Sequence, residues 1–184
     1  MRDPGDLAAE SARRLFERRT VLLTGALDGE AVAAVAASLM ALDAEGDDAV
    51  SLLVNSPGGP VDAGVAVVDV LDLLGAPVEA TVLGQAIGTA AVLVACATPG
   101  RRRAAPNARL SLRLAEGSLE GPAARLEREA AELLAGRDRL VDRLVAATGR
   151  PRDEVVAATE RGPLLSAGEA VAAGLVDEVA ARRR

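Results

Sequence analysis

Hydrophobic residues along this chain follow two patterns. Short runs rich in Val, Leu and Ala predict buried strands, whereas longer stretches with apolar residues three or four positions apart predict helices. Strand and helix alternate over the first half of the chain, and this order predicts an α/β fold with a parallel sheet joined by right-handed crossovers. The predicted strands are residues 20–25, 49–54, 78–83, 108–114 and 175–179, and the predicted helices are residues 29–44, 60–74, 86–97, 122–148, 152–159 and 166–173.

The chain of 184 residues suits a single domain, because this length supports one continuous core and the sequence contains neither a repeat nor a linker. We expect the domain to span residues 1–184, with residues 1–12 mobile. The predicted helix 122–148 is unusually long for such a core. Its apolar stripe admits two interpretations: the helix packs on its own sheet, or it reaches outward to a partner.

The charge balance is acidic, with 27 Asp and Glu against 21 basic residues, all of them Arg, and a net charge of −6. Nucleic acids are bound through basic surfaces and stacking rings, yet Phe16 is the only aromatic residue in the sequence. We therefore expect no nucleic-acid partner. The local run Arg101–Arg103 is expected to be a solvated loop rather than a binding patch.

Cysteine usage and hydropathy point to a reducing, aqueous compartment. The single cysteine, Cys96, lies in the predicted apolar helix 86–97 and cannot form an intrachain disulfide. No apolar segment reaches the ~18 to 20 residues needed to cross a bilayer, and the N-terminal stretch is too charged for a signal peptide. We expect a cytoplasmic protein with no membrane contact, no cofactor and no metal.

Residues 78–97 have the form of a strand, a glycine-bounded turn and a helix of small residues. In βα proteins such a turn presents a nucleophile beside the free N–H groups of the helix, but here the position holds Gly88. The chain also contains no histidine, so no side chain has an unperturbed pKa near neutrality that suits an ordinary general base. These features suggest a hydrolase scaffold without its catalytic side chains.

Four motifs resemble, in the same order, those of the proteolytic subunit of the Clp protease, and the similarity covers residues 11–180. It implies the Clp/crotonase-like α/β fold, a core of βαβ units with a protruding handle of a strand and a long helix over residues 115–148. The motifs are RLFERRTVLLTG (residues 14–25), which resembles the approach to the first core strand; SLLVNSPGGPVDAG (51–64), the Asn-Ser-Pro-Gly-Gly loop; VLGQAIGTAA (82–91), the nucleophile turn; and TERGPLLSAGEAVAAGLVD (159–177), the C-terminal signature.

The catalytic triad of that family is absent at the matching positions. Its nucleophile turn reads Gly-Gln-Ala-Ala-Ser-Met-Gly-Ala, and the matching residues 84–91 read GQAIGTAA, which puts Gly88 in the place of the serine. The same comparison puts Arg113 in the place of the histidine and Gly162 in that of the aspartate. Acyl transfer through serine needs a nucleophile, a base and a group that orients the base, and a guanidinium stays protonated. The resemblance thus implies a member without catalytic residues.

Two positions that form the oxyanion hole in the family remain, namely Gly59 and the N–H of Thr89. An oxyanion hole acts only beside a competent attacking group, so we interpret both positions as structural. The Thr89 hydroxyl is also a candidate for a shifted nucleophile. Because it has no neighbouring base in the sequence, a packing or helix-start role is expected instead.

The resemblance also has implications for assembly. In the family the handle seals two heptameric rings into a barrel, which favours the partner-facing interpretation of helix 122–148. The family docks an ATPase unfoldase through aromatic-lined pockets, where this chain carries Ser51, Leu52 and Leu53. We expect a non-catalytic ring subunit, a homo- or hetero-oligomer with an active Clp paralogue, in ATP-dependent protein degradation.

Three other functions stay open on the sequence alone. One is a stand-alone ring module that holds peptides or acyl groups in the old cleft. Another is a crotonase-like enzyme acting on acyl thioesters, because residues 167–176 share the Ala-x-Glu-Ala…Gly-Leu-Val ending of that group; Asp62 and Glu116 are its candidate carboxylates. The last is an active peptidase with relocated groups, centred on Thr89.

Overall fold

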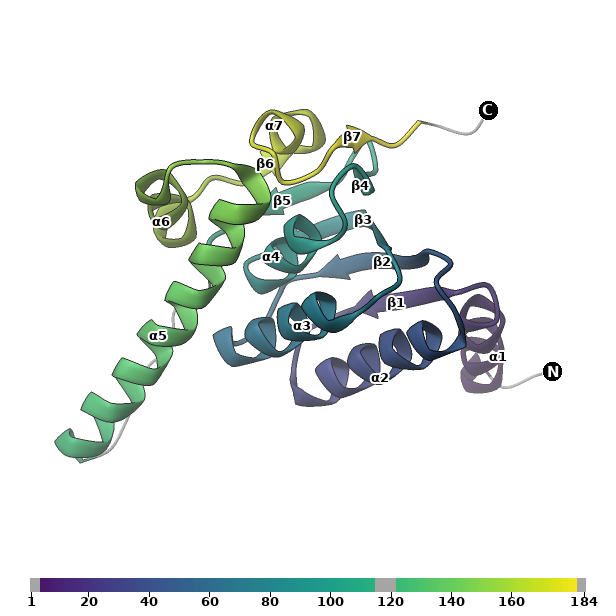
Figure 1. The fold of residues 1–184 in the computed structure, drawn as a ribbon, viewed down its shortest axis with the longest axis horizontal. Helices are drawn as coiled ribbons and strands as arrows, with labels where there is room; N and C mark the ends of the chain where they lie inside the picture. Colours follow the sequence, from purple (N-terminus) through teal and green to yellow (C-terminus); the bar gives the residue numbers. More distant parts are fainter. Residues whose placement is uncertain (1–3, 115–121, 182–184) are drawn as a thin grey trace.

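The computed structural model describes residues 4–114 and 122–181. Figure 1 shows a central sheet with helices packed on it and one long helix that projects from the body. The elements are α1 (Pro4–Phe16), β1 (Thr20–Thr24), α2 (Gly29–Glu45), β2 (Val50–Ser56), α3 (Val61–Leu73), β3 (Val78–Ile87), α4 (Thr89–Cys96), β4 (Arg102–Ala104), β5 (Arg109–Ser111), α5 (Ala123–Thr148), α6 (Arg152–Arg161), β6 (Leu165–Ser166), α7 (Ala167–Ala172) and β7 (Glu178–Val179).

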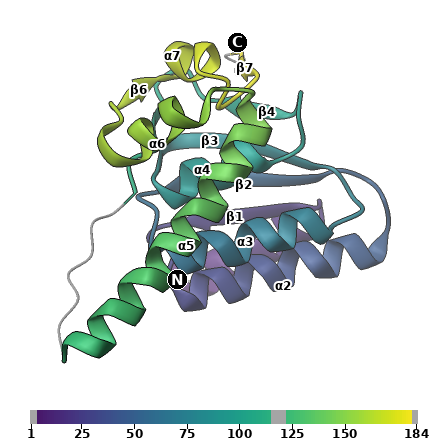
Figure 2. The same cartoon turned by 60° about the vertical axis from the view of Figure 1, so that its left-hand side comes forward.

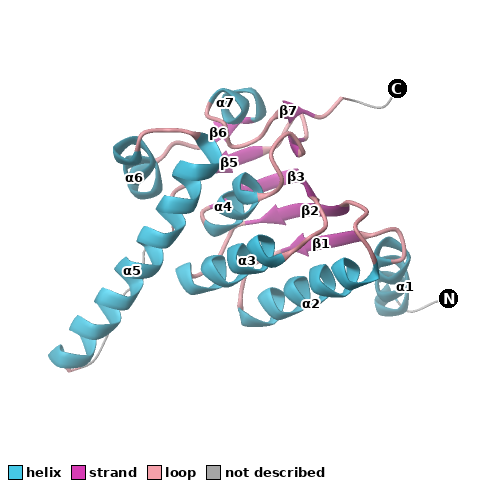
Figure 3. Cartoon of the chain, viewed as in Figure 1, coloured by secondary structure: helices cyan, strands magenta, loops and turns pink. Residues whose placement is uncertain are grey.

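The sheet is mostly parallel, which confirms the predicted α/β fold class. Its main path runs β1-β2-β3-β4-β7, while β5 pairs with the end of β3, and the short β6 pairs antiparallel with β5. Helices α2, α3 and α4 lie side by side on one face of the sheet (Figures 1 and 3). Along β2 the side chains alternate between buried and partly exposed, as expected for a strand with one face covered by helices.

Strand β3 is longer than predicted, and the following helix begins later. The strand runs to Ile87 and α4 begins at Thr89, whereas the sequence pattern predicted a strand over 78–83 and a helix from residue 86. The reason is tertiary pairing: residues 85–87 form a ladder with β5. Just before them the backbone of Gly84 turns with a φ of 81°, and the N–H of Gln85 donates to Asn55 Oδ1 at 3.3 Å.

The run Arg101–Arg103 is not a solvated loop, and the prediction made for it is wrong. Arg102 begins β4 and is 6% exposed. Its guanidinium donates two hydrogen bonds to the Asp177 carboxylate, at 2.6 and 3.0 Å, and a third to the carbonyl of Ala95 at 2.9 Å. The charge is buried because it is paired, and the pair fastens the C-terminal segment to the end of α4.

Helix α5 does both things that its apolar stripe allowed: one half packs on the core and the other half projects outward. Its second half packs on the core, where Leu140, Val141 and Leu144 are fully buried. Its first half projects from the body in both views (Figures 1 and 2), with Leu133 and Leu134 42% and 57% exposed. The strand predicted to precede this helix in the handle falls at residues 115–121, outside the described residues.

Ion pairs hold the base of α5 in place. Arg143 pairs with Asp72 of α3, and Arg152 of α6 pairs with Asp138 and Asp142 of α5. At the N-terminus, residues 1–3 lie outside the described residues and α1 begins at Pro4. The mobility predicted for residues 1–12 therefore stays a prediction.

We predict that Asp177→Asn lowers the free energy of unfolding by about 2 to 3 kcal/mol at pH 7, because it leaves the buried Arg102 without its counter-charge. Hydrogen bonds from the Arg102 side chain lower the pKa of Asp177. A carboxylate whose pKa is lower in the folded state stabilises the fold above its unfolded pKa, about 4, and this contribution disappears as the pH falls through the folded value.

Urea unfolding at pH 7 and at pH 3 measures this effect. The difference between wild type and Asp177→Asn should shrink at the lower pH. Glu178→Gln is the matched control, because it breaks the exposed pair with Arg103 and should cost less than about 1 kcal/mol. If both variants lost the same unfolding free energy, the buried ion pair of Arg102 would stabilise the fold no more than the exposed pair of Arg103.

Candidate functional site

The candidate site is built around the turn between β3 and α4. Gly88 adopts φ 55° and ψ −122°, in the left-handed half of the φ range that favours glycine. Its N–H donates to the carbonyl of Ser111 in β5 at 2.7 Å. The sharp strand-to-helix turn that presents a nucleophile in hydrolase scaffolds is thus present here, without a side chain at its apex.

The structure brings together, around the end of β5, the three positions that the sequence resemblance matched to the triad. A Cβ atom built on Gly88 would lie 3.0 Å from the carbonyl oxygen of Arg113. The N–H of Arg113 donates to Ser111 Oγ at 3.3 Å, and this hydroxyl lies 3.5 Å from the carbonyl oxygen of Gly162. Gly88, Arg113 and Gly162 are thus linked through Ser111, a buried hydroxyl that the sequence comparison did not single out.

Gly162 ends α6 in a conformation that leaves no room for a side chain. Its N–H donates to the carbonyl of Ala158 at 2.9 Å, and a Cβ atom on Gly162 would lie only 2.2 Å from that same oxygen. The backbone would have to move before an aspartate could occupy this position. The side chain of Arg113 is exposed to solvent.

The loop of Gly58 and Gly59 lies against the turn with almost no clearance. Gly58 has a φ of 81°, and a Cβ atom on it would lie 2.3 Å from the carbonyl oxygen of Ile87. A Cβ atom on Gly59 would lie 2.0 Å from the carbonyl oxygen of Leu27. Both positions require glycine for backbone packing, whatever chemistry takes place nearby.

Thr89, the first residue of α4, is buried and fully engaged by this loop. Its hydroxyl accepts a hydrogen bond from the N–H of Gly59 at 2.8 Å and donates to the carbonyl of the same residue at 3.2 Å. Its methyl group lies where a side chain at position 64 would be, 2.7 Å from a Cβ built on Gly64. The Gly59 N–H is therefore already occupied by a neutral oxygen of the chain itself.

The ionisable side chains around the site are held in other roles. Glu160, two residues before Gly162, receives a hydrogen bond from Arg137 at 2.7 Å, which lowers the pKa of Glu160 and keeps it ionised. Of the carboxylates considered for acyl chemistry, Asp62 is exposed on the first turn of α3, and Glu116 lies outside the described residues. A carboxylate fixed by an arginine is a poor proton acceptor.

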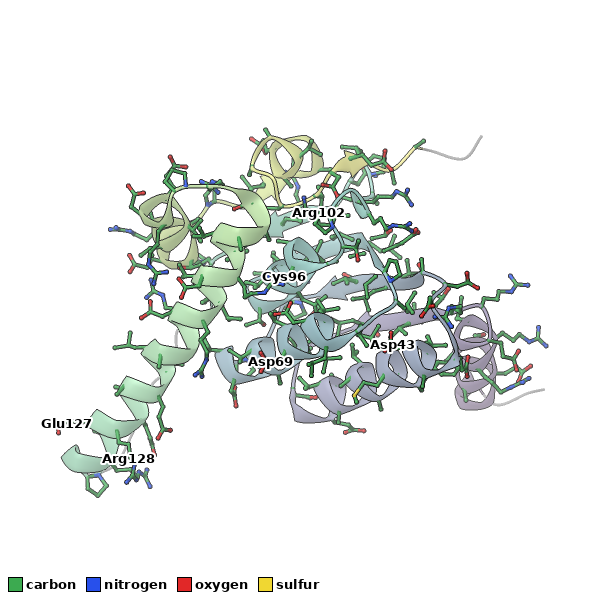
Figure 4. The ribbon with its side chains drawn as sticks, viewed as in Figure 1. Asp43, Asp69, Cys96, Arg102, Glu127 and Arg128 are labelled. Carbon is green, nitrogen blue, oxygen red and sulfur yellow. The ribbon has the colours of Figure 1, made fainter. Side chains whose placement is uncertain are left out.

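Cys96 is the one thiol, at the end of α4 (Figure 4). Burial raises its pKa to about 11, so it stays protonated and unreactive at neutral pH. Over residues 4–114 and 122–181, no three His, Cys, Asp or Glu side chains converge as a metal site would require. None of the helices in the same ranges combines the length and apolar character needed to cross a bilayer.

The mostly parallel sheet, the glycine turn and the Gly-Gly loop pressed against it define an α/β protein of the Clp/crotonase-like type. A model of the Clp protease family matches residues 4–183, so the chain belongs to the Clp protease family. Membership brings with it the serine-peptidase fold and an association with proteolysis, oligomeric rings and ATPase partners.

The conformation of Gly88 predicts that a serine at this position destabilises the fold. Gly88→Ser should lower the free energy of unfolding by about 2 kcal/mol or more, because a side chain at φ 55° is strained and its Cβ would also press on the Arg113 carbonyl. Gly100→Ser is the control, with a φ of 78° but open space around the added atom, and should cost about 1 kcal/mol. Urea unfolding measures the loss of unfolding free energy in each variant. Equal losses in Gly88→Ser and Gly100→Ser would show that the contact with the Arg113 carbonyl contributes nothing.

The hydroxyl of Thr89 gives a second prediction. Thr89→Val keeps the shape but leaves the Gly59 N–H unpaired, so it should cost about 2 kcal/mol of unfolding free energy. Thr89→Ser keeps the hydroxyl and loses only the methyl group beside Gly64, for which we expect about 1 kcal/mol. If urea unfolding found Val tolerated better than Ser, the hydrogen bond to Gly59 would not be what holds the loop.

Proposed function

We propose that this chain is a non-catalytic subunit of the Clp type, which assembles into heptameric rings with itself or with an active paralogue and serves ATP-dependent protein degradation structurally. The observation that carries this proposal is the set Gly88, Arg113 and Gly162 at the positions of the triad, in a chain without histidine. The turn at Gly88 and the Gly58–Gly59 loop are closely packed around these positions, which supports a structural role.

Proton transfer supports the proposal. A serine or threonine attacks an acyl carbon only if a neighbouring group takes its proton. The two hydroxyls at the site, those of Thr89 and Ser111, form their hydrogen bonds with backbone groups. Glu160 is ion-paired with Arg137, and an arginine at position 113 does not accept a proton.

The occupied N–H of Gly59 argues against the acyl-binding alternatives. A backbone oxyanion hole stabilises a developing negative charge only if its donors point at an empty position. Here the Thr89 hydroxyl fills that position for one donor at 2.8 Å. We therefore assign Gly59 and Thr89 a structural role, and rank a peptide-holding module or an acyl-thioester enzyme below a ring subunit.

The projecting half of α5 supports a role in assembly. A helix that leaves the body with Leu133 and Leu134 uncovered presents an apolar strip that a partner chain can bury. Its far end, with Glu127 and Arg128, is charged (Figure 4). The base is fixed by ion pairs such as Arg143 with Asp72, so the arm is held at a defined angle to the sheet.

The strand before the Asn-Ser-Pro-Gly-Gly loop suggests how the unfoldase is engaged. Leu53 stands in register beside Leu22 of β1, and both are aliphatic. Aromatic rings supply much of the contact energy where such docking pockets exist. In a mixed ring we expect the active paralogue, rather than this subunit, to provide the main ATPase contacts.

Native mass spectrometry of the chain co-expressed with an active Clp proteolytic subunit tests the proposal. We predict mixed rings that contain both subunits. Leu133→Asp combined with Leu134→Asp should reduce ring formation at least tenfold, because two charges would be buried in the arm contact. Leu73→Asp is the matched control, since Leu73 is 83% exposed on α3 and its replacement should leave assembly unchanged.

Two results would contradict the proposal. One is the exclusive formation of rings of the active paralogue, with this chain left unassembled. The other is peptide hydrolysis by the homogeneous chain at a rate that falls on Thr89→Ala.

A further inference from the structure

Strand β1 forms a free edge of the sheet. It stands at one end of the strand order and, within residues 4–114 and 122–181, pairs only with β2. Figure 1 shows it as the outermost strand, with α1 beside its start and α2 in front of it. An exposed edge presents unpaired N–H and C=O groups, which natural proteins either cover or use for association.

The hydrogen bonds between β1 and β2 show which backbone groups of β1 face outward. Ser51 donates its N–H to the carbonyl of Arg19 at 2.8 Å, and Gly25 donates to the carbonyl of Asn55 at 3.1 Å. Backbone groups alternate sides along a strand, so the odd-numbered residues between Arg19 and Gly25 also face β2. The N–H and C=O groups of the even-numbered residues, Thr20, Leu22 and Thr24, therefore point away from the sheet.

A shallow groove lies beside this edge, between α1 and α2. Its volume is about 160 Å³, and Phe16, Val21, Leu22, Ala34 and Val35 supply apolar lining. Phe16, the chain's one aromatic residue, is here only partly buried. Apolar surface therefore flanks the edge of β1.

The outward residues are self-complementary. Read in either direction, Thr20, Leu22 and Thr24 give the order Thr, Leu, Thr, so antiparallel pairing of two copies about Leu22 sets each Thr20 opposite a Thr24. Cross-strand pairs of threonine are favourable.

The flanking charges agree with the same pairing. Arg18 precedes the strand, and Asp28 and Glu30 follow it, all three exposed. Antiparallel pairing brings the basic end of one strand to the acidic end of the other. An isologous contact requires complementarity of this kind.

We infer that the free edge of β1 is a pairing surface for a second copy of this chain, joined antiparallel through Thr20, Leu22 and Thr24. The contact is two-fold symmetric, so it differs from the head-to-tail contact that closes a ring and goes beyond the proposed ring function. It extends the sheet across two chains.

Disulfide trapping tests this pairing and its register. Opposite residues in a hydrogen-bonded antiparallel pair have Cα atoms about 5.5 Å apart, within disulfide range. Leu22→Cys should thus form a covalent dimer through residue 22 of both copies under mild oxidation. Cys96 does not compete because it is buried. Leu73→Cys, more exposed but on α3, is the control and should form at least tenfold less dimer; comparable yields from the two variants would overturn the inference.

Proline at the same position tests the role of the backbone. Leu22→Pro and Leu22→Ala both remove the side chain, but only proline removes the outward N–H, and neither removes a bond to β2. Sedimentation velocity should show the pair retained in Leu22→Ala and lost in Leu22→Pro, with Thr24→Pro as a second variant if the first fails to fold. If both proline variants formed the same fraction of pairs as Leu22→Ala, edge pairing would be refuted. A failure to form mixed rings with the active paralogue would count against the ring proposal and not against this pairing.

Discussion

The turn at Gly88 is held by backbone hydrogen bonds on one side and by a side-chain hydroxyl on the other, and the rest of the site depends on this arrangement. Gly88 donates to Ser111 at 2.7 Å, and Thr89 joins the helix start to Gly59 at 2.8 Å. Gly58 lies close to the backbone of Ile87, and Gly59 lies close to the backbone of Leu27. The Gly-Gly loop is therefore packed against both segments and cannot move without them. The turn and the Gly-Gly loop are thus held against each other by short contacts.

This constraint also explains how the fold could persist in the non-catalytic subunit that we propose. The energy that holds the turn comes from hydrogen bonds and close packing, none of which needs a side chain at position 88 or 162. Replacement of a serine by glycine at a left-handed position relieves strain. The non-catalytic role that we propose is therefore physically compatible with this shape, because a subunit that serves assembly needs only the shape.

Regular periodicity predicted the helices well and the strand boundaries less well. The helix predicted over 122–148 agrees with α5 to within one residue, because its apolar spacing is regular and Gly149, at φ 68°, ends it. The end of β3 was missed, since residues 85–87 owe their strand conformation to β5, which is remote in sequence. The burial of Arg102 was missed for the same reason: its partner, Asp177, lies 75 residues away.

The candidate site was predictable in position but not in detail. Motif order assigned Gly59, Gly88, Arg113 and Gly162 to the site, and in the structure the last three lie around one strand end. No pattern could show that the Thr89 hydroxyl occupies the Gly59 N–H, because a threonine at the start of a helix is compatible with several roles. Nothing in the sequence indicated that Ser111 connects Gly88, Arg113 and Gly162 through hydrogen bonds.

The central claim is that nothing in this chain can deprotonate an alcohol for attack on an acyl carbon. Incubation of the purified protein with a fluorophosphonate, followed by intact-mass measurement and peptide mapping, tests it most directly. We predict an unchanged mass under conditions that label an active Clp proteolytic subunit fully. A stoichiometric adduct on a serine or threonine of this chain, lost when that residue is replaced by alanine, would contradict the claim.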